Sequence, residues 1–338
     1  MSVDVIEPAH GTAPPAGGRW RRTVPAVLCW LLVAPGFGWA VIRIGGLERG
    51  GLVQLLAFTP YVAGWALVPL VLALALRRWA AAGVALLAAA ALIAAVLPRA
   101  LPDDQPPAGG PTVRVLTANL LVGGADPDAL VALVRELRVD LLAVQEFTPD
   151  AQAALDRAGL AGLLPHRQLN PIPGVAGSGL YSRYPLSAVG IRQHVGGFNF
   201  TQAYATVGVP GAPPVLVESA HPTAPYALSA LGAWRADLYA EPPATPDGPL
   251  RILAGDFNST LDHKPLRDLI ATGYVDAADS LGAGLTGTWG PYDGDLIPPV
   301  TIDHVLVDRR IAVRAVSVHA LPRSDHRPVY AELPLPAG

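Results

Sequence analysis

Three long apolar runs follow one another in the first third of the chain, at residues 24–42, 52–76 and 79–97. Short joints that carry charged residues separate them. Each run is close to the roughly 20 residues that a helix needs to cross the hydrocarbon core of a bilayer. One such run could also be a buried core helix or a signal sequence. Three in succession favour three transmembrane helices, within a membrane anchor over residues 19–99.

The segments on either side of the anchor differ from it in composition. Residues 1–18 are rich in Pro, Gly and Ala and lack apolar periodicity, which predicts a disordered tail. Residues 100–111 are rich in proline and predict a short, semi-rigid linker. We therefore expect residues 112–338 to form a second domain that sits near the bilayer.

Arginines are distributed unevenly around the three runs. One side of the predicted membrane carries Arg19, Arg21, Arg22, Arg77 and Arg78, and the other carries Arg43, Arg49 and Arg99. Positive residues in short loops tend to remain in the cytoplasm. The chain is therefore predicted to be a multi-pass cell-membrane protein with a cytoplasmic amino terminus. After three spans, the second domain would lie outside the cytoplasm.

The second domain shows short apolar strands with a few amphipathic helices between them. Strands are predicted at residues 113–119, 140–144, 178–186, 187–193, 202–208, 214–220, 252–254, 300–307, 311–319 and 328–333. Helices are predicted at residues 127–137, 149–160, 226–240 and 266–270. This mixture is typical of two mostly β layers, each covered by helices.

Polar residues follow one of the buried strands. The strand at 252–254 ends at a glycine and is followed by Asp256 and Asn258. Ligands of α/β sheets bind beyond the carboxyl ends of strands, so this pair is placed for chemistry. Asp256 can accept a proton, and the Asn258 amide can donate to a phosphate oxygen while staying uncharged. Taken alone, the same turn is equally an ordinary loop whose side chains bond their own backbone.

Charge and cysteine content exclude some functions. Residues 1–109 hold 8 of the 24 Lys and Arg and 5 of the 27 Asp and Glu, which leaves residues 110–338 with a net charge of −6. A mildly acidic domain argues against sequence-independent electrostatic binding to duplex DNA. The single cysteine, Cys29, lies in an apolar run and rules out a disulfide framework and zinc–thiolate chemistry.

Seven short segments occur in an order that resembles the endonuclease/exonuclease/phosphatase superfamily, whose fold is that of deoxyribonuclease I. They are LTAN at 116–119, VQE at 144–146, LYSRYP at 180–185, HP at 221–222, GDFN at 255–258, IDHV at 302–305 and SDHRP at 324–328. One such segment would be weak, but the ordered set is specific. The resemblance covers residues 112–335 and does not extend to the membrane anchor.

The resemblance implies a four-layer α/β sandwich with a divalent-metal site. Glu146 would be the principal metal ligand, with Asn119 beside it and Asp325 as a second candidate. Oxygen ligands of this kind suit Mg²⁺ or Mn²⁺. Without the resemblance, Glu146 could be a helix-capping acid and Asn119 a turn residue.

The resemblance also implies catalytic roles. Asp256 would orient and deprotonate the attacking water, and Asn258 would bind the scissile phosphate. His326 would sit on the phosphate as a donor or acid, kept protonated by Asp303, with His221 as a second phosphate contact. An Asp-His pair such as 303–304 is more often a surface pair, and the alternation of a strand should point His304 away from Asp303.

These observations predict a membrane-anchored, divalent-metal-dependent phosphoesterase whose partners are the bilayer and a phosphate-ester substrate. That substrate could be a lipid headgroup or a nucleic acid; the tether and the net charge lean toward lipid or small phosphoesters. Trp289, at a position near the rim of the family's site, could stack on a base or a headgroup, or simply pack. The alternatives are a nuclease acting on DNA or RNA and a non-catalytic binding module held at the membrane.

Overall fold

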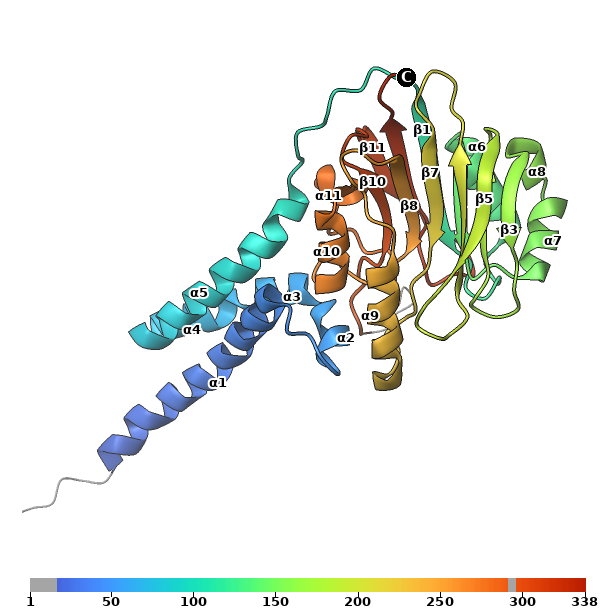
Figure 1. The fold of residues 1–338 in the computed structure, drawn as a ribbon. Helices are drawn as coiled ribbons and strands as arrows, with labels where there is room; N and C mark the ends of the chain where they lie inside the picture. The colour runs from blue at the N-terminus through green and yellow to red at the C-terminus, as the bar shows by residue number, and fades with distance from the viewer. Residues whose placement is uncertain (1–16, 291–295) are drawn as a thin grey trace, which may run out of the picture.

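The computed structural model describes residues 17–290 and 296–338 (Figure 1). The tail predicted for residues 1–18 lies outside this range except for its last two residues, which begin the first helix. The described chain contains a helical region, a linker and an α/β sandwich. In Figure 1 the helices α1 and α5 run together away from the sandwich, with α2 and α3 in the corner between them and the sandwich.

The helical region differs from the prediction of three continuous spans. Its elements are α1 (Gly17–Gly45), α2 (Leu52–Leu56), α3 (Thr59–Trp65), α4 (Leu67–Ala75), α5 (Trp79–Val96) and the 3₁₀ turn η1 (Leu97–Ala100). The second predicted span, 52–76, is thus divided into three helices. Pro60 starts α3, and Pro69 has no N–H to donate to the carbonyl of Trp65, so the helix is interrupted at both places.

Two helical stretches among the described residues are long and apolar enough to cross a membrane, Val24–Gly45 and Trp79–Ala100. Most of each stretch is not buried inside the protein. Leu31 and Leu87, for example, are 64% and 67% exposed. The faces that are buried pack α1 and α5 against each other and against α4 through small side chains such as Cys29 and Ala85.

The sandwich is built, within the described residues, from two six-stranded mixed sheets. The first has the order β11 (Ala315–Val318), β12 (Val329–Pro334), β1 (Thr112–Asn119), β2 (Leu141–Gln145), β4 (Ser178–Ser182) and β3 (His166–Asn170). The second has the order β5 (Leu186–Gln193), β6 (Thr201–Val207), β7 (Val215–Ala220), β8 (Leu250–Asp256), β10 (Asp303–Asp308) and β9 (Tyr274–Asp276). One neighbouring pair in each sheet is parallel, β1–β2 and β7–β8.

Helices cover the outer face of each sheet. The first sheet carries α6 (Pro127–Glu136), α7 (Pro149–Arg157) and α8 (Leu160–Leu163). The second carries α9 (Leu231–Ala240), which follows the turn η2 (Leu228–Ala230), and α10 (Lys264–Ala271), while α11 (Ala277–Ser280) follows β9. A core of Val, Leu, Ile and Ala side chains fills the space between the sheets. The result is the predicted α/β sandwich.

The linker is bound to the sandwich along part of its length. The backbone N–H of Asp103 donates to the carbonyl of Ser280, and the Gln105 side chain accepts from the N–H of Val313. The linker therefore connects the helical region to the surface of the sandwich.

Candidate active site

The site lies where strands of both sheets end. Asn119 is the last residue of β1, Gln145 of β2 and Asp256 of β8, and Asp303 is the first residue of β10. Asp303 and Asp256 are direct partners across the antiparallel β8–β10 ladder. The glycine before Asp256 is required here, because a Cβ on Gly255 would lie 1.8 Å from the carbonyl oxygen of Ala220.

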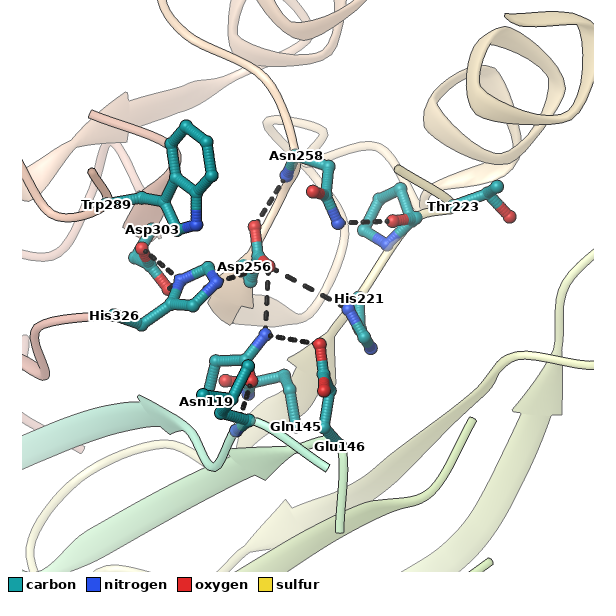
Figure 2. A network of polar contacts seen from close by, with 12 residues as sticks. Asn119, Gln145, Glu146, His221, Thr223, Asp256, Asn258, Trp289, Asp303 and His326 are labelled. Atoms are coloured by element: carbon teal, nitrogen blue, oxygen red, sulfur yellow. Dashed lines mark hydrogen bonds and ion pairs between the residues drawn. The ribbon is translucent and has the colours of Figure 1, made fainter. Parts of the chain in front are cut away.

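Asp256 is buried at the centre of the site (Figure 2). Its Oδ1 accepts from the backbone N–H of Asn258 at 2.8 Å, and its Oδ2 accepts from Nδ2 of Asn119 at 3.0 Å. The Nε2 atoms of His326 and His221 lie 3.7 and 3.8 Å from the same Oδ2. Burial and the nearby charge of Asp303 outweigh the opposing effect of His326 and raise the pKa of Asp256 to about 7. A carboxylate with this pKa can accept a proton at neutral pH.

His326 and Asp303 form a buried pair. Nδ1 of His326 lies 3.0 Å from both oxygens of Asp303, which leaves Nε2 directed at Asp256. Burial alone would lower the pKa of His326, but the carboxylates of Asp303 and Asp256 outweigh it and raise the pKa to about 10. The imidazolium form, which can donate from Nε2, is thus favoured at neutral pH.

His221 and Asn258 complete the side of the site away from His326. His221 is buried against Phe200, with ring centroids 4.9 Å apart, and burial lowers its pKa to about 3. It is therefore a neutral hydrogen-bonding group. Asn258 has φ +47° and donates from Nδ2 to the carbonyl of Pro222 at 3.0 Å, which fixes its amide beside Asp256.

Of the three residues predicted to bind metal, Glu146 and Asn119 are in direct contact, and Asp325 lines the same pocket as Glu146. Glu146, with φ +53°, accepts from Asn119 Nδ2 at 3.2 Å and from the N–H of Val122 at 2.6 Å. Asp325 lines the same pocket; its Oδ2 accepts from the indole N–H of Trp289 at 2.9 Å, while its buried Oδ1 has no hydrogen-bond partner among the described residues. The carboxylates of Glu146 and Asp325, the second with one oxygen that has no hydrogen-bond partner, and the amide of Asn119 are a donor set that fits Mg²⁺ or Mn²⁺.

A second group also meets the distance requirement for a metal. Ligand atoms of Asp256, Asp303 and His326 lie within 4.8 Å of one another. Nδ1 of His326 is already occupied by Asp303. The structure therefore offers two candidate metal positions, this group and the carboxylates of Glu146 and Asp325.

Each of the eight predicted site residues is found at this one location, although the strand pattern alone did not show that they would meet. The supporting contacts around the site were not predicted, although Thr288 matches a family position near the rim of the site and Gln145 lies in one of the seven segments. Thr288 Oγ1 accepts from the N–H groups of Ile302 and Asp303, both at 3.0 Å, and Gln145 donates to Ser219 Oγ at 2.9 Å from one sheet to the other. These contacts involve backbone groups and pairs distant in sequence, so no local pattern identifies them.

Three histidines without an expected role have structural partners. His304 points away from Asp303, as the strand alternation predicts; its Nδ1 lies 2.6 Å from Asp276 and its Nε2 lies 2.8 Å from the carbonyl of Ser259. His194 pairs with Asp237 at 3.1 Å. The Nδ1 atom of His263 accepts from the N–H of Thr260 at 2.9 Å.

A pocket of about 710 Å³ opens above the catalytic groups. Its floor contains Glu146, His221, Asp256, Asn258, Asp325 and His326. Its walls include several aromatic and aliphatic side chains, Phe58, Val175, Phe198, Tyr226, Trp289 and Ile297. The volume falls in the range of small-molecule sites.

Comparison with known proteins agrees with this geometry. Residues 116–326 match the model of the Endonuclease/Exonuclease/phosphatase family. No curated protein sequence matches the chain significantly. Among solved structures, an endonuclease/exonuclease/phosphatase from Beutenbergia cavernae DSM 12333 is similar, with 20% identity, a TM-score of 0.54 and coverage of 67% of this chain and 72% of that one.

Two further solved structures have the same fold. D. rerio TDP2 complexed with single strand DNA product is 14% identical, with a TM-score of 0.51 and coverage of 66% of this chain and 98% of that one. Truncated Caenorhabditis elegans TDP2 is 15% identical, with a TM-score of 0.50 and coverage of 66% and 97%. At these identities the likeness concerns the fold, and the helical region falls outside the part that matches the family.

Proposed function

Because the chain belongs to the endonuclease/exonuclease/phosphatase family, we propose that it is a divalent-metal-dependent phosphoesterase acting on phosphodiester or phosphomonoester bonds. Members of this family typically hydrolyse phosphate esters. The observation that carries the proposal is the position of Asp256, whose Oδ2 lies within 3.8 Å of side-chain nitrogens of Asn119, His221 and His326. A proton acceptor surrounded by donors is what hydrolysis of a phosphate ester needs.

In the proposed reaction, Asp256 accepts a proton from water as the water oxygen forms a bond to phosphorus. The bond from phosphorus to the leaving oxygen breaks, and His326 donates from Nε2 to the oxygens that gain charge. Asp303 holds His326 in the orientation and protonation state for this step. Neutral His221 and the Asn258 amide donate hydrogen bonds to the phosphate.

The metal would be held by Glu146, with Asn119 and Asp325. When bound, it would polarise the phosphate and stabilise negative charge in the transition state. The unsatisfied Oδ1 of Asp325 and the carboxylate of Glu146 in the same pocket support this assignment.

We further propose that the helical region anchors the enzyme in the cell membrane. The exposed apolar surfaces of Val24–Gly45 and Trp79–Ala100 support two crossings, and the shorter segment Thr59–Ala75, which packs against both, would provide a third. The sandwich would lie on the side opposite the amino terminus. Arg43 and Arg99 at the near ends of α1 and α5 both bind Asp262 of the sandwich, so neither is a free positive charge of the kind that retains a loop in the cytoplasm.

The proposal is tested with the full chain in detergent. The substrates are bis(p-nitrophenyl) phosphate and p-nitrophenyl phosphate, assayed with Mg²⁺ or Mn²⁺, after EDTA, and after the metal is added back. We expect metal-dependent release of p-nitrophenol that Asp256→Asn lowers by at least about 10²-fold. The matched control is Asp247→Asn, an exposed residue far from the site, which should behave as wild type. Activity that survives both EDTA and Asp256→Asn would overturn the proposal.

A further inference from the structure

One wall of the catalytic pocket comes from the helical region. Gln54, Ala57 and Phe58, in α2 and the turn before α3, line the pocket that also contains Asp256 and His326. These three residues lie outside the segment that matches the family. The pocket is thus completed by a part of the chain that the fold of the sandwich does not itself supply.

This wall is fixed to the sandwich by its own contacts. Val53 is 1% exposed and belongs to the core beneath α9 and α10, and its carbonyl lies 2.8 Å from Nε2 of His263. Gln54 donates to the carbonyl of Pro225 at 2.7 Å on one side of the pocket. Tyr61 donates to the carbonyl of Pro299 at 2.7 Å. Residues 53–61 are therefore held to the sandwich by three hydrogen bonds.

A buried ion-pair cluster holds the ends of the two long apolar helices beside this wall. Asp262, fully buried, binds Arg99 at 2.6 and 2.8 Å and Arg43 at 3.0 Å. Arg43 lies in the last turn of α1, and Arg99 lies in the 3₁₀ turn η1 that follows α5. Asp262 directly precedes His263, which lines the catalytic pocket. If these helices cross a bilayer, the pocket lies close to its surface.

The rim of the pocket is apolar and exposed. Tyr226 is 69% exposed, Ile297 is 53% exposed and Phe198 packs edge-on against Tyr226 with ring centroids 6.3 Å apart. Leu228 and Leu296, next to these in sequence, are 67% and 99% exposed. Exposed apolar side chains gathered around a pocket mark contact with a membrane or an apolar ligand.

The pocket lacks the groups that hold a nucleic acid strand. Among its lining residues in the described parts of the chain there is no lysine or arginine. Proteins that bind single strands combine stacking aromatics with a cationic groove along the phosphates. Here the aromatic side chains are present, but the positive charges that would follow a polyanionic backbone are absent from the described lining.

We propose that the substrate is an amphiphilic phosphate ester of the bilayer, a membrane lipid. Its phosphate would bind between His326, His221 and the Glu146 side, and its apolar part would lie against Phe58, Phe198 and Tyr226. Phe58 is then a specificity-determining residue supplied by the helical region. This inference rests on the proposed function and adds the class of substrate to it.

The test uses the full chain in nanodiscs of dioleoyl phosphatidylcholine. The panel contains dioleoyl phosphatidylglycerol, phosphatidic acid and phosphatidylinositol 4,5-bisphosphate, their dibutanoyl counterparts, single-stranded DNA and bis(p-nitrophenyl) phosphate. We expect at least one dioleoyl lipid, or the phosphatidylcholine itself, to be hydrolysed with kcat/KM at least tenfold above its dibutanoyl form. Phe58→Ala and Tyr226→Ala should each lower that ratio roughly tenfold, as expected when an aromatic side chain that the lipid chain would cover is removed. Tyr226 is exposed enough that its removal does not threaten folding. The matched control is Phe37→Ala, on α1 and outside this pocket, which should leave the ratio unchanged.

The outcomes separate the two proposals. If no member of the panel is hydrolysed, the proposed function fails and the inference with it. If bis(p-nitrophenyl) phosphate or DNA is hydrolysed and no lipid is, the enzyme is a phosphoesterase and the lipid assignment is wrong. Equal rates on long and short chains, or an unchanged ratio in both pocket variants, would also overturn it.

Discussion

At the scale of single residues, the role of Asp303 in catalysis can be distinguished from a role in stability. We predict that Asp303→Asn lowers kcat by about 10²-fold or more, because His326 loses the carboxylate that orients and charges it. The matched control is Asp308→Asn, a buried aspartate at the other end of β10 that pairs with Arg310. That variant should keep kcat within about twofold even where it lowers the melting temperature. Similar losses of kcat in both would show that Asp303 acts only through the fold.

A second prediction concerns the pH dependence of the stability that His304 contributes. Burial lowers its pKa, but Asp276 outweighs this and raises the pKa above its usual value. A raised folded-state pKa contributes stability that is fully present below about pH 6.5 and is lost as pH rises through the folded pKa. We expect His304→Gln to lower the melting temperature more at pH 6 than at pH 9. Tryptophan fluorescence during heating measures the melting temperature at each pH. A larger decrease at pH 9 than at pH 6 would contradict a positively charged His304 in the folded protein.

Residues of the candidate site were predicted from the sequence where they belong to short local motifs. Asp256 and Asn258 follow a buried strand two residues apart, and Asp303 stands at the start of another, so chain order and strand ends were informative. The supporting contacts of Thr288 and Ser219 were not predicted, because each supports the site through backbone groups or through a partner in the opposite sheet. Such contacts depend on how the two sheets pack.

At the scale of elements, the division of the second apolar run shows what hydrophobicity cannot distinguish. Residues 52–56 are as apolar as a membrane span, yet Val53 packs in the core of the sandwich. Lipid and protein interior are both apolar solvents, so the pattern alone does not separate them. The strands β3 and β9 were missed for a related reason: β3 lies at an edge, where its residues are only partly buried, and β9 has three residues.

The ion-pair cluster between the helical region and the sandwich yields a third prediction. Asp262→Asn leaves Arg99, 5% exposed, without its buried counter-charge, and should lower the free energy of unfolding by about 3–5 kcal/mol. Burial raises the pKa of Asp262, but Arg99 and Arg43 outweigh it and lower that pKa. The contribution is therefore present above about pH 4, is lost only as pH falls through the folded pKa, and should be the same at pH 6 and pH 8.

The control for this cluster is Asp268→Asn on α10, whose partner Lys264 lies at the surface. Surface pairs contribute little, so denaturant unfolding of this variant should resemble that of wild type. Equal decreases in the free energy of unfolding of Asp262→Asn and Asp268→Asn would mean that the buried cluster does not hold the helical region in place.

At the scale of the whole molecule, topology gives a fourth prediction. In a Cys29→Ser background, Ala132→Cys places a thiol on the exposed face of α6, and Arg77→Cys places one at the exposed joint between α4 and α5. If the sandwich lies outside the cytoplasm, an impermeant maleimide added to intact cells should label position 132 and leave position 77 unlabelled until the cells are opened. The reverse pattern would invert the orientation.

The most direct test of the central claim follows the oxygen of the attacking water. Hydrolysis of bis(p-nitrophenyl) phosphate by the full chain with Mg²⁺ is run in ¹⁸O-labelled water, and both products are examined by mass spectrometry. The expected result is one ¹⁸O in the phosphate product, none in p-nitrophenol, and loss of the labelled product in Asp256→Asn. Label in p-nitrophenol, or undiminished labelling of phosphate in Asp256→Asn, would contradict water attack at phosphorus assisted by Asp256.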